Sequence, residues 1–554
     1  MRPSRSACLL IPLILGACGE GLTPPPPGPP PPPAVELSCS GITDVVLAPG
    51  QSVVLGAAAS GGCIRMPSGT EAREYLAVAY SASGHTDAQG ISGPYRWRTR
   101  SATAPLATAE VPSEFADDPV VRFHATLRAR ERALPRRVEL RAPSAGPGSS
   151  AVTVGERRSF GACSDPNCLA FTTFLATAAY VGRRFALFLD DSLPAGGFTE
   201  EEYQRLGALF DDHLYPIDTA AFGRESDVDG NGVVLAVITR QVNRLCLAVG
   251  GVVSGYFYGL DLTPAEPGSN GAEVLFAAAP DPQGENGCRV TRDLVERVLP
   301  GTLVHEFQHM ISYNQHVLLR GGALEDDWLN EGLSHLAEEL AGRRVPNGSC
   351  IASDCLSQFA FNDVSNAYQY LVDPERWHLV MPSNSAGRVA ERGAAWLLLR
   401  WIIDQYGGAH GGSDALTRSL VSTNRLGATN LSAVTGVPFA DLLGEWHLAN
   451  YLDDLPGFSP ANVRLKYTTW NWRITFPGLR SQFPAQYPRF FPLLPDSTSG
   501  VYDHDGMLRG GSGRHLRVQL SAGAEPVDFR LTDLTGSGPV DGSVDGRIAV
   551  VRIR

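Results

Sequence analysis

Three absences narrow the class of protein that this chain can be. The sequence has no block of Lys or Arg, and its formal net charge is −12 with a pI near 5.5. Nucleic acid and anionic lipid surfaces are therefore excluded as partners, because both are bound through clustered cations. Beyond the N-terminus no apolar run reaches the roughly 18 residues that span a bilayer. The longest candidate, 394–403, contains Arg400.

The third absence concerns cysteine: no two cysteines have the CxxC spacing of a structural zinc site. Of the 10 cysteines, Cys8 and Cys18 lie in the N-terminal segment. The other eight form four pairs of neighbours in the sequence, namely Cys39 and Cys63, Cys163 and Cys168, Cys246 and Cys288, and Cys350 and Cys355. An even number in an exported chain predicts four disulfides, although the sequence alone does not choose the pairing.

The N-terminus predicts export. Arg2 and Arg5 precede a short apolar run, and Leu15-Gly16-Ala17-Cys18 resembles a bacterial lipobox. We expect residues 1–17 to be a signal peptide and Cys18 to carry lipid, with an ordinary secretory signal as the alternative. Residues 18–34 then form a lipidated N-terminus and a polyproline linker. The predicted location is the bacterial cell envelope, anchored by lipid to the outer membrane or cell surface, or the medium after secretion, and only the lipid contacts the membrane.

A chain of 554 residues is too long to fold around a single hydrophobic core of ordinary size, so several domains are expected. Short β-rich runs, including 120–127, predict a β domain over 35–150, and the Arg-rich stretch 128–141 is interpreted as a solvated linker. Strand-like and helical segments alternate over 151–458, where Thr199 is the expected N-cap of a helix over 199–214. Aromatic and β-branched runs such as 465–476 predict a C-terminal β domain over 459–554.

The most informative stretch is 301–339. His305-Glu306-Phe307-Gln308-His309 places two imidazoles one helical turn apart on one face, where both can reach a single zinc ion. The expected helix begins near Leu299-Pro300. The competing interpretation is a pair of structural histidines on a core helix.

A catalytic zinc needs a third protein ligand and keeps its fourth position for water. The HExxHxxGxxH pattern would require Gly at Ser312 and His at Gln315, and His316 lies too far along the helix axis. The third ligand is therefore expected on a second helix, over 326–341. Glu331 lies off the leucine stripe of that helix and is the candidate, while Glu338 is an alternative ligand or a hydrogen-bonding neighbour of one.

These two motifs, His305 to Met310 and Trp328 to Ser334, resemble the hyicolysin family of secreted bacterial zinc metallopeptidases and, more broadly, the gluzincins. The resemblance implies that His305, His309 and Glu331 bind zinc and that Glu306 is the catalytic base. It also implies an α+β zincin-like catalytic domain, with a mixed-sheet lobe and a mostly α lobe, flanked here by the two β domains. One departure is His335, which stands where thermolysin-like enzymes have the Asp that orients a zinc-bound histidine.

The predicted function is a zinc-dependent peptidase, an endopeptidase, acting on protein or peptide substrates. Oxyanion donors are sought among Tyr368, Tyr370, Tyr406 and His335, each of which is also explained as a packed core residue. The alternatives are a catalytically inactive zincin-fold surface binding or adhesion lipoprotein, and a zinc hydrolase of another bond. No sequence pattern indicates an oligomeric state.

A second cation site is a separate hypothesis. Asp227, Asp229 and Asn231 alternate with other residues in a Gly-containing loop, as in the first half of a calcium loop. The twelfth position, which an EF-hand fills with Glu, is Ile238. An EF-hand is therefore not expected, and the alternatives are a calcium loop of another kind and a plain β-turn.

Overall fold

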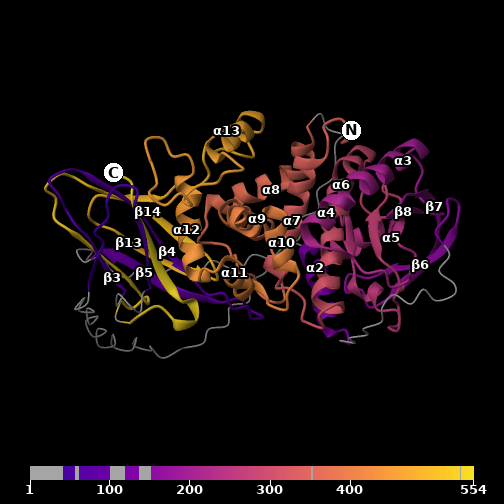
Figure 1. Cartoon of the computed structure of the whole chain (residues 1–554), viewed down its shortest axis with the longest axis horizontal. Coiled ribbons are helices and arrows are strands. Elements are labelled where there is room, and N and C mark those ends of the chain that lie inside the picture. Colours follow the sequence, from indigo (N-terminus) through magenta and orange to yellow (C-terminus); the bar gives the residue numbers. More distant parts are fainter. Residues whose placement is uncertain (1–41, 57–61, 100–118, 136–150, 351–353, 537) are drawn as a thin grey trace, which may run out of the picture.

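The computed structural model describes residues 42–56, 62–99, 119–135, 151–350, 354–536 and 538–554 (Figure 1). The predicted signal peptide, Cys18, the polyproline linker and Cys39 lie outside these residues. Three regions follow one another along the long axis of the molecule. A β unit occupies one end, helices fill the middle, and a second sheet with its own helices occupies the other end.

The β unit contains strands from both ends of the chain. Its strands are β1 (Thr43–Asp44), β2 (Ser52–Gly56), β3 (Cys63–Met66), β4 (Arg73–Ser81), β5 (Ser92–Thr99), β12 (Asp496–Thr498), β13 (Asp503–Arg509), β14 (Gly513–Leu520), β15 (Val527–Thr532) and β16 (Gly546–Arg552). They form two sheets, in the orders β1-β3-β15-β5-β13 and β12-β14-β4-β16-β2. Each sheet interleaves early and late strands, and β4 pairs antiparallel with both β14 and β16. The expectation of a separate β domain at each end is therefore wrong.

The physical reason lies in how the faces of β4 are covered. Alternate side chains point to opposite faces of a strand. Tyr75, Ala77 and Ala79 pack between the two sheets with Trp97 and Phe529, whereas the opposite face packs into the main helical core. A strand buried on both faces has to sit inside a sheet, and only the late strands supply neighbours for it.

The second sheet has six strands, in the order β10-β11-β9-β8-β7-β6. They are β6 (Arg157–Cys163), β7 (Phe171–Val181), β8 (Phe185–Asp190), β9 (Val234–Thr239), β10 (Gly255–Phe257) and β11 (Val274–Ala278). Strands β8, β9 and β11 run parallel, while β10 pairs antiparallel with β11 and is an edge. The sheet is mixed, as expected, and β7 and β8 pair antiparallel as a hairpin.

The helices begin and end as follows: α2 (Pro119–Ala133), α3 (Glu200–Leu209), α4 (Tyr215–Phe222), α5 (Arg240–Val249), α6 (Arg292–Tyr313), α7 (Asp327–Arg344), α8 (Cys355–Val372), α9 (Val389–Tyr406), α10 (Ser413–Val421), α11 (Gly427–Thr435), α12 (Phe439–Leu452) and α13 (Trp472–Gln482). Short π-helical turns, Phe210–Leu214 and Asn314–Leu318, follow α3 and α6, and 3₁₀ turns occur at Gly259–Leu262, Gly408–His410 and Gly542–Val544. Thr199 caps α3 as predicted, in a capping box with Glu202. Within the described part of the chain, no helix is long and apolar enough to cross a bilayer.

Three local expectations are wrong. Residues 120–127 belong to helix α2, and Arg128, expected in a solvated linker, is buried and paired with Glu131. The helix of the zinc motif begins at Arg292 and not near Pro300, because Thr291 caps it and Pro300 is accommodated inside it. The run 465–476 is not a strand, since Asn471 accepts a hydrogen bond from the Ile474 N–H and starts α13.

Three disulfides join Cys163 to Cys168, Cys246 to Cys288, and Cys350 to Cys355. These are three of the four neighbouring pairs that the sequence presented. The bond between Cys246 and Cys288 ties α5 to the loop that precedes α6. It thereby holds the end of the zinc-motif helix against the mixed sheet.

Candidate metal centre

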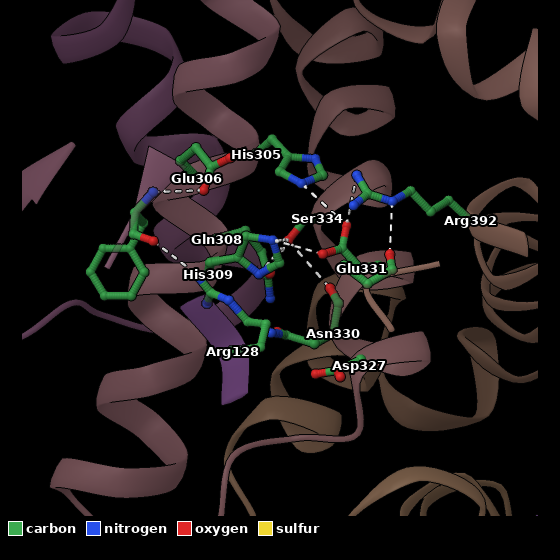
Figure 2. Close-up of polar contacts among 12 residues, drawn as sticks. Arg128, His305, Glu306, Gln308, His309, Asp327, Asn330, Glu331, Ser334 and Arg392 are labelled. Atoms are coloured by element: carbon green, nitrogen blue, oxygen red, sulfur yellow. Dashed lines mark hydrogen bonds and ion pairs between the residues drawn. The ribbon is translucent and has the colours of Figure 1, made fainter. Parts of the chain in front are cut away.

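Two antiparallel helices bring the predicted zinc ligands together (Figure 2). His305 and His309 project from α6 toward Glu331 on α7. The leucine stripe of α7, with Leu329, Leu333 and Leu336, is completely buried. Glu331 lies off that stripe, on the side of α7 that faces His305 and His309, and α7 is buried on all sides from Asp327 to Gly342.

The spacing of the three side chains fits one zinc ion. Glu331 Oε2 lies 3.6 Å from His305 Nε2, and Glu331 Oε1 lies 3.6 Å from His309 Nε2. These separations are longer than a hydrogen bond. They are close to the distance between two ligand atoms in a tetrahedral zinc site, which is roughly 3.4 Å when each ligand lies about 2.1 Å from the zinc. One atom from each of the three residues lies within 4.8 Å of the others. The donors present therefore suit zinc.

Neighbouring side chains orient the ligands. Glu338 Oε1 lies 2.8 Å from His305 Nδ1, so Nε2 is the nitrogen left to face Glu331. Arg392 NH1 lies 3.2 Å from Glu331 Oε2, and the Ser334 hydroxyl contacts the ring of His309. Glu338 thus supplies the carboxylate that would set the tautomer of His305 in a metal site, a role that His335 cannot take in this sequence.

The protonation states of His309 and Glu331 suit metal binding, whereas His305 carries one proton that a metal ion would have to displace. Burial holds the pKa of His309 well below its usual value, so that its imidazole is neutral. Burial would raise the pKa of Glu331, but Arg392 and the two histidines hold it well below its usual range. Burial likewise lowers the pKa of His305, yet Glu331 and Glu338 raise it to about 10. A zinc ion held by His305 would therefore have to displace a proton from it.

Glu306 lies beside the ligands and against the edge of the mixed sheet. Its side chain is 4% exposed, and its Oε2 accepts a 2.9 Å hydrogen bond from the N–H of Phe257 on β10. Burial raises the pKa of Glu306, and the charges of His305 and Arg128 oppose that rise. The bond to Phe257 holds the carboxylate in one place, as a positioned base requires.

A cavity of about 490 Å³ opens onto this group, and it is lined by His305, Glu306, His335, Glu338 and Arg392. Helix α2 contributes Val120, Val121 and His124 to the same lining. The size is that of a site for a few residues of a ligand. The metal centre is therefore accessible from a cavity that α2 partly walls.

His335, a candidate from the sequence, faces this cavity. Its Nδ1 lies 2.9 Å from Glu338 Oε1 and 2.8 Å from Asp363 Oδ1. Burial lowers the pKa of His335, but the two carboxylates raise it to about 9. A protonated imidazole thus stands next to the metal centre, with its ring centroid 4.8 Å from that of His305.

The three tyrosines named as oxyanion donors are placed elsewhere, which contradicts that interpretation of them. The Tyr368 hydroxyl accepts a 2.8 Å hydrogen bond from the Arg489 N–H, Tyr370 stacks on Trp446, and Tyr406 packs against Trp401. None of the three lines the cavity. These tyrosines of α8 and α9 are packed core residues, which is the alternative explanation given above.

Several groups at the site carried no recognisable signal in the sequence. Arg392 comes from α9 and Asp363 from α8, each separated from the HExxH motif by more than 50 residues. Arg128 and His124 come from α2, which the sequence had suggested was a strand.

Replacing Glu338 by Gln is expected to weaken zinc binding about 10–100-fold, because the charge that holds the His305 tautomer is lost. The dissociation constant is measured by competition with a chelator at pH 7.5. Glu325→Gln, which alters a buried carboxylate that bonds Asn430, is the matched control and should leave zinc binding unchanged. Equal affinity in wild type and Glu338→Gln would remove Glu338 from the site.

Comparison with known proteins places the sequence near one class of enzyme. No protein-family model matches the chain. Over 166 residues it is 28% identical to the neutral metalloprotease ShpI of Staphylococcus hyicus. That match covers 30% of this chain and 36% of the relative, so the chain spans about a third of the length of this curated protein.

Among solved structures, an M1 zinc metallopeptidase from Deinococcus radiodurans, in a mutant form bound to a Tyr-Ser-Ala substrate, is similar over 52% of this chain and 51% of its own. The sequence identity is 16% and the TM-score 0.29. At that score the structural similarity carries no argument about this chain.

Proposed function

We propose that the protein is a zinc-dependent peptidase. One observation carries the proposal: a buried, positioned carboxylate, Glu306, stands beside three side chains with zinc-ligand spacing, and Glu306 and His305 line one cavity. Similarity to a metalloprotease supports the class, although it covers a minor part of both chains. An inactive binding protein has no physical need for a base beside the metal.

Each residue at the site would then have a distinct task. His305, His309 and Glu331 would hold the zinc, which when bound polarises a water molecule and lowers its pKa. Glu306 accepts a proton from the attacking water and passes it to the amine that leaves. His335, protonated and facing the cavity, is our candidate for stabilising the negative charge that develops on the substrate carbonyl oxygen.

Strand β10 supplies a surface for the substrate backbone. Phe257 directs its N–H toward Glu306 and its carbonyl toward Arg128, so both groups point away from β11. Both groups of Phe257 are already bonded, so an extended peptide would add to this edge through main-chain hydrogen bonds at Gly255, which faces the same way on β10. A strand-like substrate that runs past the metal on both sides is the mode of an endopeptidase, which is the activity we propose.

Helix α2 restricts this edge. Arg128 donates a 2.7 Å hydrogen bond to the Phe257 carbonyl, and Glu131 accepts one of 2.7 Å from the Gly259 N–H. On the opposite side Arg132 contacts the Ser383 carbonyl at 3.0 Å and also pairs with Asp327. A peptide that adds to β10 must therefore share the cleft with α2 or displace it.

Weakening the attachment of α2 is expected to open the site. Arg132→Ala removes the contacts to Ser383 and Asp327, and we expect severalfold faster loss of zinc to a large excess of chelator. Arg157→Ala, which breaks the exposed ion pair between Arg157 on β6 and Asp191, is the control. Identical rates in Arg132→Ala and wild type would mean that α2 does not limit access.

The location that we propose is outside the cytoplasm, with a lipid on Cys18. Three disulfides support an oxidising compartment, since such bonds are rare in the bacterial cytosol. Labelling with radioactive palmitate in wild type and Cys18→Ala tests the lipid. Label in both proteins would contradict it.

The proposed activity is tested with the zinc-loaded full chain on casein and on a mixed library of quenched peptides. We expect internal cleavage that 1,10-phenanthroline abolishes and added zinc restores. A protein that holds zinc but cleaves nothing would favour the surface-binding alternative.

A further inference from the structure

We propose that Asp227, Asp229 and Glu273 form a second cation site, separate from the zinc centre and suited to calcium. Asp227 and Asp229 belong to the loop before β9, and Glu273 directly precedes β11, which pairs with β9. One carboxylate oxygen from each of the three residues lies within 4.8 Å of the others. The pairing of the two strands thus brings a third carboxylate to the loop.

The side chain of Glu273 is the observation that points to a ligand. The residue is 1% exposed. Its Oε1 accepts hydrogen bonds from the Ser226 hydroxyl and from the Val228 N–H at 2.9 Å. Its Oε2 is buried and has no hydrogen-bond partner among the described residues. A buried carboxylate oxygen without a partner is costly, and a cation is the partner that both the charge and the two neighbouring aspartates favour.

The protein itself supplies little positive charge here. Arg158 NH1 lies 3.7 Å from Asp229 Oδ2, and the same side chain also pairs with Glu156. Of the three carboxylates in the cluster, this guanidinium pairs with that of Asp229. Burial raises the pKa of Glu273 to about 7, against the hydrogen bonds from Ser226 and Val228, so that near neutral pH a cation competes with a proton for this carboxylate.

The identity of the ligand residues differs from the sequence pattern. The Asn231 side chain is engaged locally: its Oδ1 accepts a 2.7 Å hydrogen bond from the Val233 N–H, and its Nδ2 donates to Asp229. Glu273 takes the place in the cluster that the sequence pattern had suggested for Asn231. With only oxygen donors and several carboxylates, the cluster suits a hard cation such as calcium rather than zinc.

A structural cation in this place would tie the loop before β9 to β11. Both strands are central to the sheet that carries edge strand β10 and thereby supports Glu306. The expected consequence is stability of the mixed sheet, with no part in the chemistry at the zinc centre.

The test is thermal unfolding of the zinc-loaded full chain in EGTA, in 5 mM calcium chloride and in 5 mM magnesium chloride. EGTA also binds zinc, so it is added after zinc loading and the zinc content of the protein is then measured. A change in Tm is interpreted only for protein that has kept its zinc. We expect calcium to raise the Tm by about 5–11 °C, the shift for a ligand near 100 times its Kd on a domain of about 150–250 residues. Isothermal titration with calcium alone should give one site per chain.

Glu273→Gln keeps the size of the side chain and should lose both the calcium shift and the titration signal. Asp229→Asn is a second variant in case the first does not fold. Asp212→Asn, an exposed carboxylate elsewhere in the same lobe, should keep the wild-type response. A wild type with no calcium shift and no heat of binding would overturn the proposal, as would a Glu273→Gln protein that binds calcium like wild type.

Discussion

Glu306→Gln is expected to bind one zinc per chain and to lose about 10²–10⁴-fold in kcat/KM. The amide has the size of the carboxylate, and its oxygen still accepts the hydrogen bond from the Phe257 N–H, so the fold and the three ligands are unaffected. What disappears is the ability to take a proton from the attacking water. Because the step that uses this proton is the one that forms the tetrahedral intermediate, kcat should fall while KM changes little.

The measurement combines zinc content by mass spectrometry with initial rates on one quenched peptide. Glu296→Gln alters a carboxylate on the same helix α6 that does not line the cavity, and it should behave like wild type. An active Glu306→Gln enzyme would show that another group is the base. A variant that loses zinc would show that Glu306 is a ligand.

Glu331→Ala is expected to abolish stable zinc binding and, with it, all hydrolysis. The side chain supplies the charged ligand and lies 3.6 Å from both imidazoles. Its removal also leaves Arg392 facing two histidines without the carboxylate that it pairs with. That cation repels a divalent ion, so the loss should exceed the 10–100-fold effect of a residue that only orients a ligand.

Two variants separate these contributions. Glu331→Gln keeps the shape of the side chain but not its charge, and it should also fail to retain zinc through gel filtration. Arg392→Gln keeps the ligand and removes the repelling cation, so it should still bind zinc. Zinc retention by Glu331→Ala at the wild-type level would mean that the third ligand lies elsewhere.

The sequence was sufficient to predict the parts of the site that depend on local geometry. His305 and His309 lie on one face because a helix repeats every 3.6 residues, and Glu331 lies off the leucine stripe of α7, on the side that faces them. The same pattern placed Glu338 two turns away, where it remained open whether it was a ligand or a neighbour of one. Only the crossing of α6 and α7 decides this, and it puts Glu338 on His305 Nδ1.

What the sequence could not predict depends on contacts between distant segments. Strand β2 pairs with β16, which lies near the other end of the sequence, and Val53 stands opposite Val550. No local sequence pattern predicts the register of two strands so far apart in the chain. The apolar run 120–127 predicts a strand because its residues fit either period, and only its packing against the core of the mixed sheet, through Phe123 and Leu127, identifies it as helix α2. The role of Arg392 likewise follows from the packing of α9 on α7.

The most direct test of the central claim is X-ray absorption at the zinc K-edge of the zinc-loaded wild type, compared with Glu331→Gln. The account predicts a four-coordinate shell of nitrogen and oxygen at about 2.0–2.1 Å that contains two imidazoles and no sulfur. It also predicts that this shell is absent from the variant after gel filtration. Sulfur at about 2.3 Å, or an unchanged shell in Glu331→Gln, would contradict it.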